Sequence, residues 1–102
     1  MKAITETIKN LIEEHGAELL KQERKFKAFL ADLHPNEKSF RFLLELSLKA
    51  DIPKKIAALQ NEHSAMIDSN LASLKHYFKE EYFLEDRAVN SVFDCWVDVF
   101  TE

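Results

Sequence analysis

The sequence predicts an all-α protein, and three observations support this class. Only one glycine and two prolines occur in 102 residues, whereas β-hairpins depend on glycine-containing turns. No segment alternates apolar and polar residues for the length of a strand. Instead, apolar residues recur three and four positions apart in successive segments, which is the helical period. We therefore expect a single domain over residues 1–102, folded as a compact bundle of five or six short helices.

The helix expected at about residues 37–50 contains the most apolar stretch of the chain, Phe40–Leu48. At helical spacing this stretch has two apolar stripes, one of Phe40, Leu43, Leu44, Ser47 and Leu48 and one of Phe42 and Leu46. A helix that is apolar on two faces must be covered on two faces. We therefore expect this helix at the centre of the bundle.

Two helices are expected before the central one. The first, Ala3–His15, should end at Gly16, because glycine most easily adopts the left-handed conformation that closes a helix. The second, Gln22–Leu33, should end before Pro35, because the residue that precedes a proline disfavours the helical conformation. Asn36 is then the expected N-cap of the central helix.

Three further helices are expected after the central one. A short helix should begin at Ile52-Pro53, because proline fits the first helical turn. After a polar connection at Gln60–Ser64, a fifth helix is expected at Ala65–Glu81. A sixth should begin near Glu85 or Asp86, since acidic residues favour the N-terminal end of a helix.

The charge of the chain is unevenly distributed. Residues 1–50 contain nine Lys or Arg against eight Asp or Glu, whereas residues 51–102 contain five against ten. An acidic second half repels the phosphate backbone, which argues against general nucleic-acid binding. Cys95 is the only cysteine, so an intrachain disulfide is excluded and a reducing cytoplasm is the expected compartment. No apolar run approaches the roughly 20 residues that cross a bilayer, so we expect no membrane association.

The order of several turn and packing residues resembles a small all-helical domain of bacterial proteins. The matching segments are Asp32-Leu33-His34-Pro35, the leucine-rich helix, Ala50-Asp51-Ile52-Pro53, and the final set of Leu84, Ala88-Val89, Val92-Phe93 and Trp96. In the family these correspond to a D-L-x-P turn, an A-G-I-P turn and a C-terminal A-V-x-x-W helix. Members of that family sit beside kinase-like, signalling or stress-related modules. The resemblance implies an accessory or interaction domain without catalysis of its own.

The chain departs from that family pattern at three places. Asp51 and Phe83 each stand where the pattern has glycine, so we expect the helix that ends at Asp51 to close differently. The chain ends in Phe100-Thr101-Glu102 in place of the family's A-L-G ending.

The histidines do not form a metal site by their spacing. They are His15, His34, His63 and His76, and no two of them are four residues apart as in helical zinc sites. His34 lies in the Asp32–Pro35 turn, where Asp32 is its expected partner. We therefore predict no metal and no cofactor.

The remaining chemically reactive residues also argue against an enzyme. Neighbouring carboxylates, such as Glu80 and Glu81, point about 100° apart on a helix and do not converge as an acid–base pair. Asp94 and Asp98 share a face, which we interpret as solvated, and they should raise the pKa of Cys95, making it a poor nucleophile. No glycine-rich phosphate loop can form with one glycine.

The aromatic content is the strongest functional signal. Eight Phe, two Tyr and one Trp are many for a domain of 102 residues, so part of them is expected to form an apolar surface patch for a protein partner. The candidate interaction residues are Phe42, Leu46, Tyr77, Tyr82 and Phe83. The first hypothesis is therefore a non-catalytic protein–protein interaction or adaptor domain of a bacterial intracellular protein.

Two alternatives remain open. One is a nucleic-acid-associated regulator that uses a basic face of Lys21, Arg24, Lys25 and Lys27. The other is a homodimer or larger assembly of this chain alone.

Overall fold

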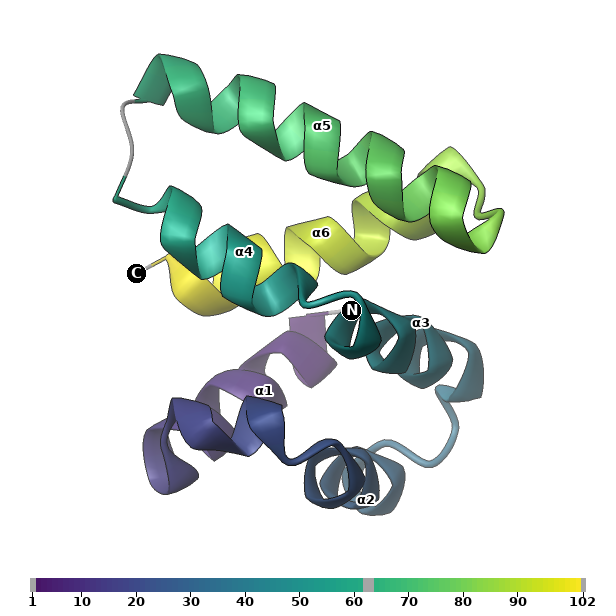
Figure 1. Cartoon of the computed structure of the whole chain (residues 1–102). Coiled ribbons are helices and arrows are strands. Elements are labelled where there is room, and N and C mark those ends of the chain that lie inside the picture. Colours follow the sequence, from purple (N-terminus) through teal and green to yellow (C-terminus); the bar gives the residue numbers. More distant parts are fainter. Residues whose placement is uncertain (1, 62–63, 102) are drawn as a thin grey trace.

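The predicted all-α class is confirmed. The computed structural model describes residues 2–61 and 64–101, which contain six α-helices, one 3-10 helix and no strand (Figure 1). In chain order the elements are α1 (Lys2–His15), η1 (Ala17–Lys21), α2 (Glu23–Leu33), α3 (Lys38–Lys49), α4 (Ile52–Leu59), α5 (Ser64–Tyr82) and α6 (Asp86–Phe100). The predicted helix ends therefore differ from the observed ones by about one residue. Glu62 and His63 of the predicted polar connection lie outside the described residues.

The middle of the bundle is shared between α3 and α6. Helix α3 packs against α2, α4 and α6, as expected for an inner helix, whereas α6 packs against α1, α3, α4 and α5. In Figure 1, α5 lies above α6, and α1 and α2 lie below it. Val92, Phe93 and Trp96 of α6 are fully buried. The sequence indicated α3 as the central helix, but α6 contributes the largest buried side chain, Trp96.

The two apolar stripes of α3 are covered unequally. Phe40, Leu44, Ser47 and Leu48 of the first stripe are buried, and Leu43 is half-buried. In the second stripe Leu46 packs against the core, but 58% of Phe42 remains exposed. The expectation that both faces are covered is therefore wrong at Phe42, because the three helices that pack against α3 leave this part of its surface uncovered.

A buried polar chain joins the two inner helices. The indole Nε1 of Trp96 donates a hydrogen bond to Ser47 Oγ at 2.8 Å, and Ser47 Oγ donates to the Leu44 carbonyl at 2.6 Å. Burial of an indole N–H without a partner is unfavourable. Ser47 therefore has a role in this apolar stripe, because its hydroxyl accepts the hydrogen bond of the buried Trp96 indole.

Three helix ends are closed by residues with positive φ. Gly16 follows α1 as expected, but with φ of 82° and ψ of 165° it lies outside the expected left-handed helical region, in a conformation that is essentially restricted to glycine. Asp51 follows α3 at φ 59° and ψ 27°, and its N–H donates to the Leu48 carbonyl at 3.1 Å. The expectation of a different closure at Asp51 is wrong, because Asp51 adopts the left-handed geometry that glycine favours. The third such residue, Phe83, follows α5.

The start of α3 also differs from the prediction. Its N-cap is Glu37, and Asn36 lies in the preceding turn. The Glu37 N–H donates to the His34 carbonyl at 3.3 Å, which extends the turn by one residue. No side-chain capping bond forms at Glu37.

Candidate interaction surface

Phe83 is the most exposed large apolar residue of the described chain. Its side chain is 94% exposed and its φ is +54°. The helix end around it has the Schellman pattern, in which the Leu84 N–H donates to the Lys79 carbonyl at 3.0 Å. Leu84 packs against the core. The backbone and Leu84 therefore fix the turn, and the Phe83 ring projects from it.

The turn that carries Phe83 is acidic. Lys79 and Asp86 form an ion pair across it at 2.9 Å, and the hydrogen bond from Lys79 to Asp86, with their Coulombic attraction, raises the pKa of Lys79. Glu81 and Glu85 lie two residues before and after Phe83, are exposed, and form no ion pair with any described residue. Two exposed carboxylates without an ion pair among the described residues therefore lie within two residues of Phe83 along the chain.

The other predicted interaction residues do not gather around Phe83. Tyr82 is half-buried, with its ring edge against Phe78 at a centroid distance of 5.4 Å. Tyr77 is 45% exposed, and the Lys55 ammonium lies 5.2 Å from its ring centroid. Tyr77 and Tyr82 are five residues apart and so point about 140° away from each other. These two tyrosines are thus partly occupied by contacts within the chain.

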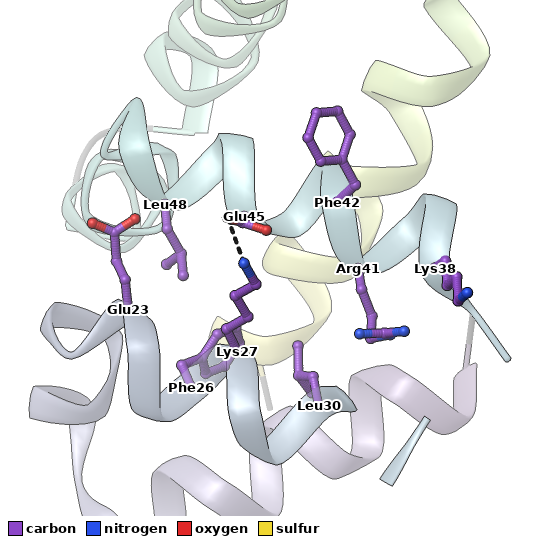
Figure 2. A pocket seen from close by; sticks show the side chains of 9 residues that line it. All are labelled: Glu23, Phe26, Lys27, Leu30, Lys38, Arg41, Phe42, Glu45 and Leu48. Atoms are coloured by element: carbon purple, nitrogen blue, oxygen red, sulfur yellow. Dashed lines mark hydrogen bonds and ion pairs between the residues drawn. The ribbon is translucent and has the colours of Figure 1, made fainter. Parts of the chain in front are cut away.

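Phe42 and Leu46 lie on a different helix from the tyrosines. They belong to α3, which makes no extensive contact with α5 within the described residues. Figure 2 shows the Phe42 ring on the side of α3 that faces away from α2. The five predicted residues therefore do not form one exposed patch, since Leu46 and Tyr82 pack against the core, and Phe83 and Phe42 are the most accessible aromatic ones among them.

The predicted basic residues do not form one face. Lys21 belongs to η1 and pairs with Glu18 at 3.4 Å. Lys27 pairs with Glu45 of α3 at 3.3 Å. Lys25 and Lys27 point about 160° apart on α2. Arg24 is exposed, but Glu23 precedes it on the same helix, so the positive charge is dispersed and partly neutralised.

A groove between α2 and α3 was not anticipated from the sequence. It has a volume of about 250 Å³ and an apolar floor that includes Phe26, Leu30 and Leu48. The Lys27–Glu45 pair lies across it, while Lys38 and Arg41 point from α3 at one end (Figure 2). Arg41 Nη2 donates to the Pro35 carbonyl at 3.3 Å, which orients the guanidinium. The groove thus combines an apolar floor with two cations that form no ion pair among the described residues, Lys38 and Arg41, and with the acidic Glu23.

The three described histidines each have a partner within the chain. Nε2 of His34 lies 2.7 Å from Thr7 Oγ1, and its Nδ1 lies 3.7 Å from Glu37. The predicted partner Asp32 is therefore wrong, because the turn directs His34 toward α1. His15 stacks on Phe29, and His76 lies beside Glu80. His63 lies outside the described residues, among which no group of His, Cys, Asp and Glu could hold a metal ion.

Cys95 is a core residue. It is 2% exposed, and Thr5 Oγ1 donates a hydrogen bond to its Sγ at 3.2 Å. Burial is the main cause that raises the pKa of the Cys95 thiol, with a smaller contribution from the charge of Asp98. The direction of the predicted shift agrees, but its main cause was missed, because the sequence does not show burial.

Comparison of the chain with known protein families, with curated proteins and with solved structures found no significant match. Among the described residues, no helix combines the length and the apolar character needed to span a bilayer. The candidate surface therefore has to be interpreted from its own geometry and chemistry.

Proposed function

We propose that this chain is a non-catalytic protein–protein interaction or adaptor domain of a bacterial intracellular protein, and that Phe83 anchors its partner. The observation that carries this proposal is the combination of 94% exposure and positive φ at a phenylalanine. Either feature alone occurs on ordinary surfaces, but their combination at one bulky residue is unusual.

The energetics of Phe83 support this interpretation. A left-handed conformation costs a non-glycine residue about 1–2 kcal/mol. An exposed ring gains almost nothing from burial in the free domain, so the Phe83 side chain itself does not offset this cost. Burying a phenylalanine side chain in a partner contributes about 1.5–3 kcal/mol. Strained residues of this kind are concentrated at functional sites, where binding supplies the compensation.

The setting of the ring limits the class of partner. Glu81 and Glu85 flank Phe83, so a matching surface has an apolar cavity for the ring and cationic side chains at its rim. This acidic setting disfavours a nucleic acid. The dispersed charges of Lys21, Lys25 and Lys27 give that alternative little support.

Affinity purification of the tagged chain from its host tests the proposal. The design compares wild type, Phe83→Ala and Met66→Ala, since Met66 is also on α5 and is 55% exposed. We expect one protein to be retained in near-stoichiometric amount by wild type and Met66→Ala and lost with Phe83→Ala. The purified partner should then bind the wild-type chain at least about 30-fold more tightly than Phe83→Ala, the effect of a hot spot of 2 kcal/mol.

Equal retention by all three variants would remove Phe83 as the anchor. Retention of nucleic acid that is lost at high salt would instead favour the regulator hypothesis.

A further inference from the structure

The apolar cavity and the cationic rim that Phe83 requires of a partner are present on this chain itself. We propose that the groove between α2 and α3 binds the turn between α5 and α6 of a second copy of the chain, with Phe83 in the groove. This inference rests on the proposed function and names the partner that Phe83 would take. Three observations lead to it, namely the size of the groove, its charges and the position of the turn.

The groove has room for the ring. An apolar cavity of about 150 Å³ accommodates benzene, and the groove has a volume of about 250 Å³. Its floor contains Phe26 and Leu30, and Phe42 stands at its edge with 58% of its surface exposed. Insertion of Phe83 would therefore bury its exposed ring against Phe26 and Leu30, whereas the Phe42 ring lies on the side of α3 that faces away from α2 (Figure 2).

The charges of the two surfaces are opposite. Lys38 and Arg41 at one end of the groove form no ion pair with any described residue. Glu81 and Glu85 on either side of Phe83 are likewise unpaired within the described chain. Two carboxylates of one copy can therefore meet two cations of another, which fixes the orientation of the turn.

A second groove makes a weaker match. It is larger, at about 420 Å³, and lies between η1, α4 and the end of α6. Its charged lining contains Lys54, Lys21, which pairs with Glu18, and the acidic Glu23 and Asp51. Glu23 lines both grooves, but among the described residues the groove between α2 and α3 has two cations without an ion pair, Lys38 and Arg41, and the second groove has one, Lys54. The groove between α2 and α3 is therefore the better match for a turn with two unpaired carboxylates. Lys54 then supplies a matched control for charge reversal.

The contact must form between copies. Phe83 lies at the end of α5, which makes no extensive contact with α2 or α3 within the described residues, so the turn does not occupy its own groove. Each copy presents one turn and one groove. Two copies can thus exchange turns in a closed pair, or continue head to tail if the geometry does not close.

Sedimentation equilibrium over micromolar to near-millimolar concentrations tests this proposal. Wild type should associate, and association should weaken as salt rises because exposed charges contribute. Phe83→Ala should lower the association constant at least about 30-fold, as expected for a hot-spot residue. The double variant Lys38→Glu/Arg41→Glu should be monomeric, and so should the double variant Glu81→Lys/Glu85→Lys. The control variant Lys54→Glu should associate as wild type does.

A mixture of the two double variants with reversed charges gives the most specific test. In such a mixture each turn meets a groove of opposite charge, so association should return although neither protein associates alone. Far-ultraviolet circular dichroism checks that the variants are folded. Lys38→Glu alone replaces the pair if Arg41→Glu is unfolded, since Lys38 is exposed.

The outcomes separate this inference from the proposed function. A wild-type chain that stays monomeric at all concentrations overturns the inference, and so does association that survives both charge reversals. If a different protein is retained in a Phe83-dependent manner while the chain stays monomeric, the proposed function stands and only the self-association fails. If Phe83→Ala changes neither association nor retention, both fail.

Discussion

Replacing Phe83 by glycine should stabilise the fold while weakening binding. Relief of the left-handed conformation contributes about 1–2 kcal/mol, and the greater flexibility of glycine in the unfolded chain offsets about 0.5–1 kcal/mol of this. The ring is 94% exposed, so its removal sacrifices little packing. The net gain in the free energy of unfolding is therefore about 0.5–1 kcal/mol. In a domain of this size it raises Tm by about 2–8 °C.

The assay is urea unfolding of wild type, Phe83→Gly and Phe83→Ala, followed by tryptophan fluorescence of the buried Trp96. Alanine keeps the Cβ and hence the conformational cost, so Phe83→Ala should unfold within about 0.5 kcal/mol of wild type. Phe83→Asn should lie between alanine and glycine, because asparagine tolerates the left-handed region. All three substitutions should weaken binding to the same degree, since all remove the ring.

One result would refute this reasoning. If Phe83→Gly and Phe83→Ala both destabilise the fold by more than about 1 kcal/mol, the ring packs within the domain, and its exposure cannot be the basis of an interaction site. If Phe83→Gly raises the free energy of unfolding but weakens binding, phenylalanine at this position serves binding and not stability.

Further substitutions test other parts of the structure. Gly16→Ala should destabilise the fold by about 1–3 kcal/mol from backbone strain alone, because nothing lies within 4 Å of the added Cβ; urea unfolding measures this. Asp51→Gly should stabilise by less than about 0.5 kcal/mol in the same assay, since aspartate already tolerates positive φ. Ser47→Ala should cost about 1–3 kcal/mol by leaving the Trp96 indole unpaired, and a double-mutant cycle with Trp96→Phe should reveal coupling. The raised pKa of Cys95 stabilises the neutral thiol in the folded state, so this contribution is complete below the ordinary pKa of 9.0 and is lost as pH rises through the folded value. Compared with Cys95→Ala, wild type should therefore lose additional stability above about pH 9 in unfolding titrations.

The helices were predictable because their signals are local. Apolar spacing defines α1, and Gly16 and Pro35 mark breaks that depend on backbone geometry alone. These signals act within a few residues, so the predicted helix ends lie close to the observed ones. The N-cap of α3 was misplaced by one residue because the turn before it is stabilised by a bond between His34 and Glu37. Turn hydrogen bonds of that kind have no periodic signature.

The surface was less predictable because exposure depends on the positions of other helices. Phe40 and Phe42 are both apolar residues of α3, yet one is 5% and the other 58% exposed. Periodicity shows that they point in different directions but not which direction a neighbouring helix covers. The groove between α2 and α3 could not be predicted for the same reason, since Leu30 and Arg41 line one groove only after the two helices have packed. Ser47 looked like an ordinary member of an apolar stripe because its partner Trp96 is 49 residues away.

The two left-handed residues of the bundle require different explanations. Asp51 and Phe83 both close helices at positive φ. Aspartate is enriched several-fold among non-glycine residues in that region, so Asp51 needs no role beyond closing α3. Phenylalanine has no such preference, and the solvent-exposed ring cannot compensate through packing. Glycine would fit the turn equally well at both positions, so the turn does not require phenylalanine at residue 83. What phenylalanine adds there is an exposed ring.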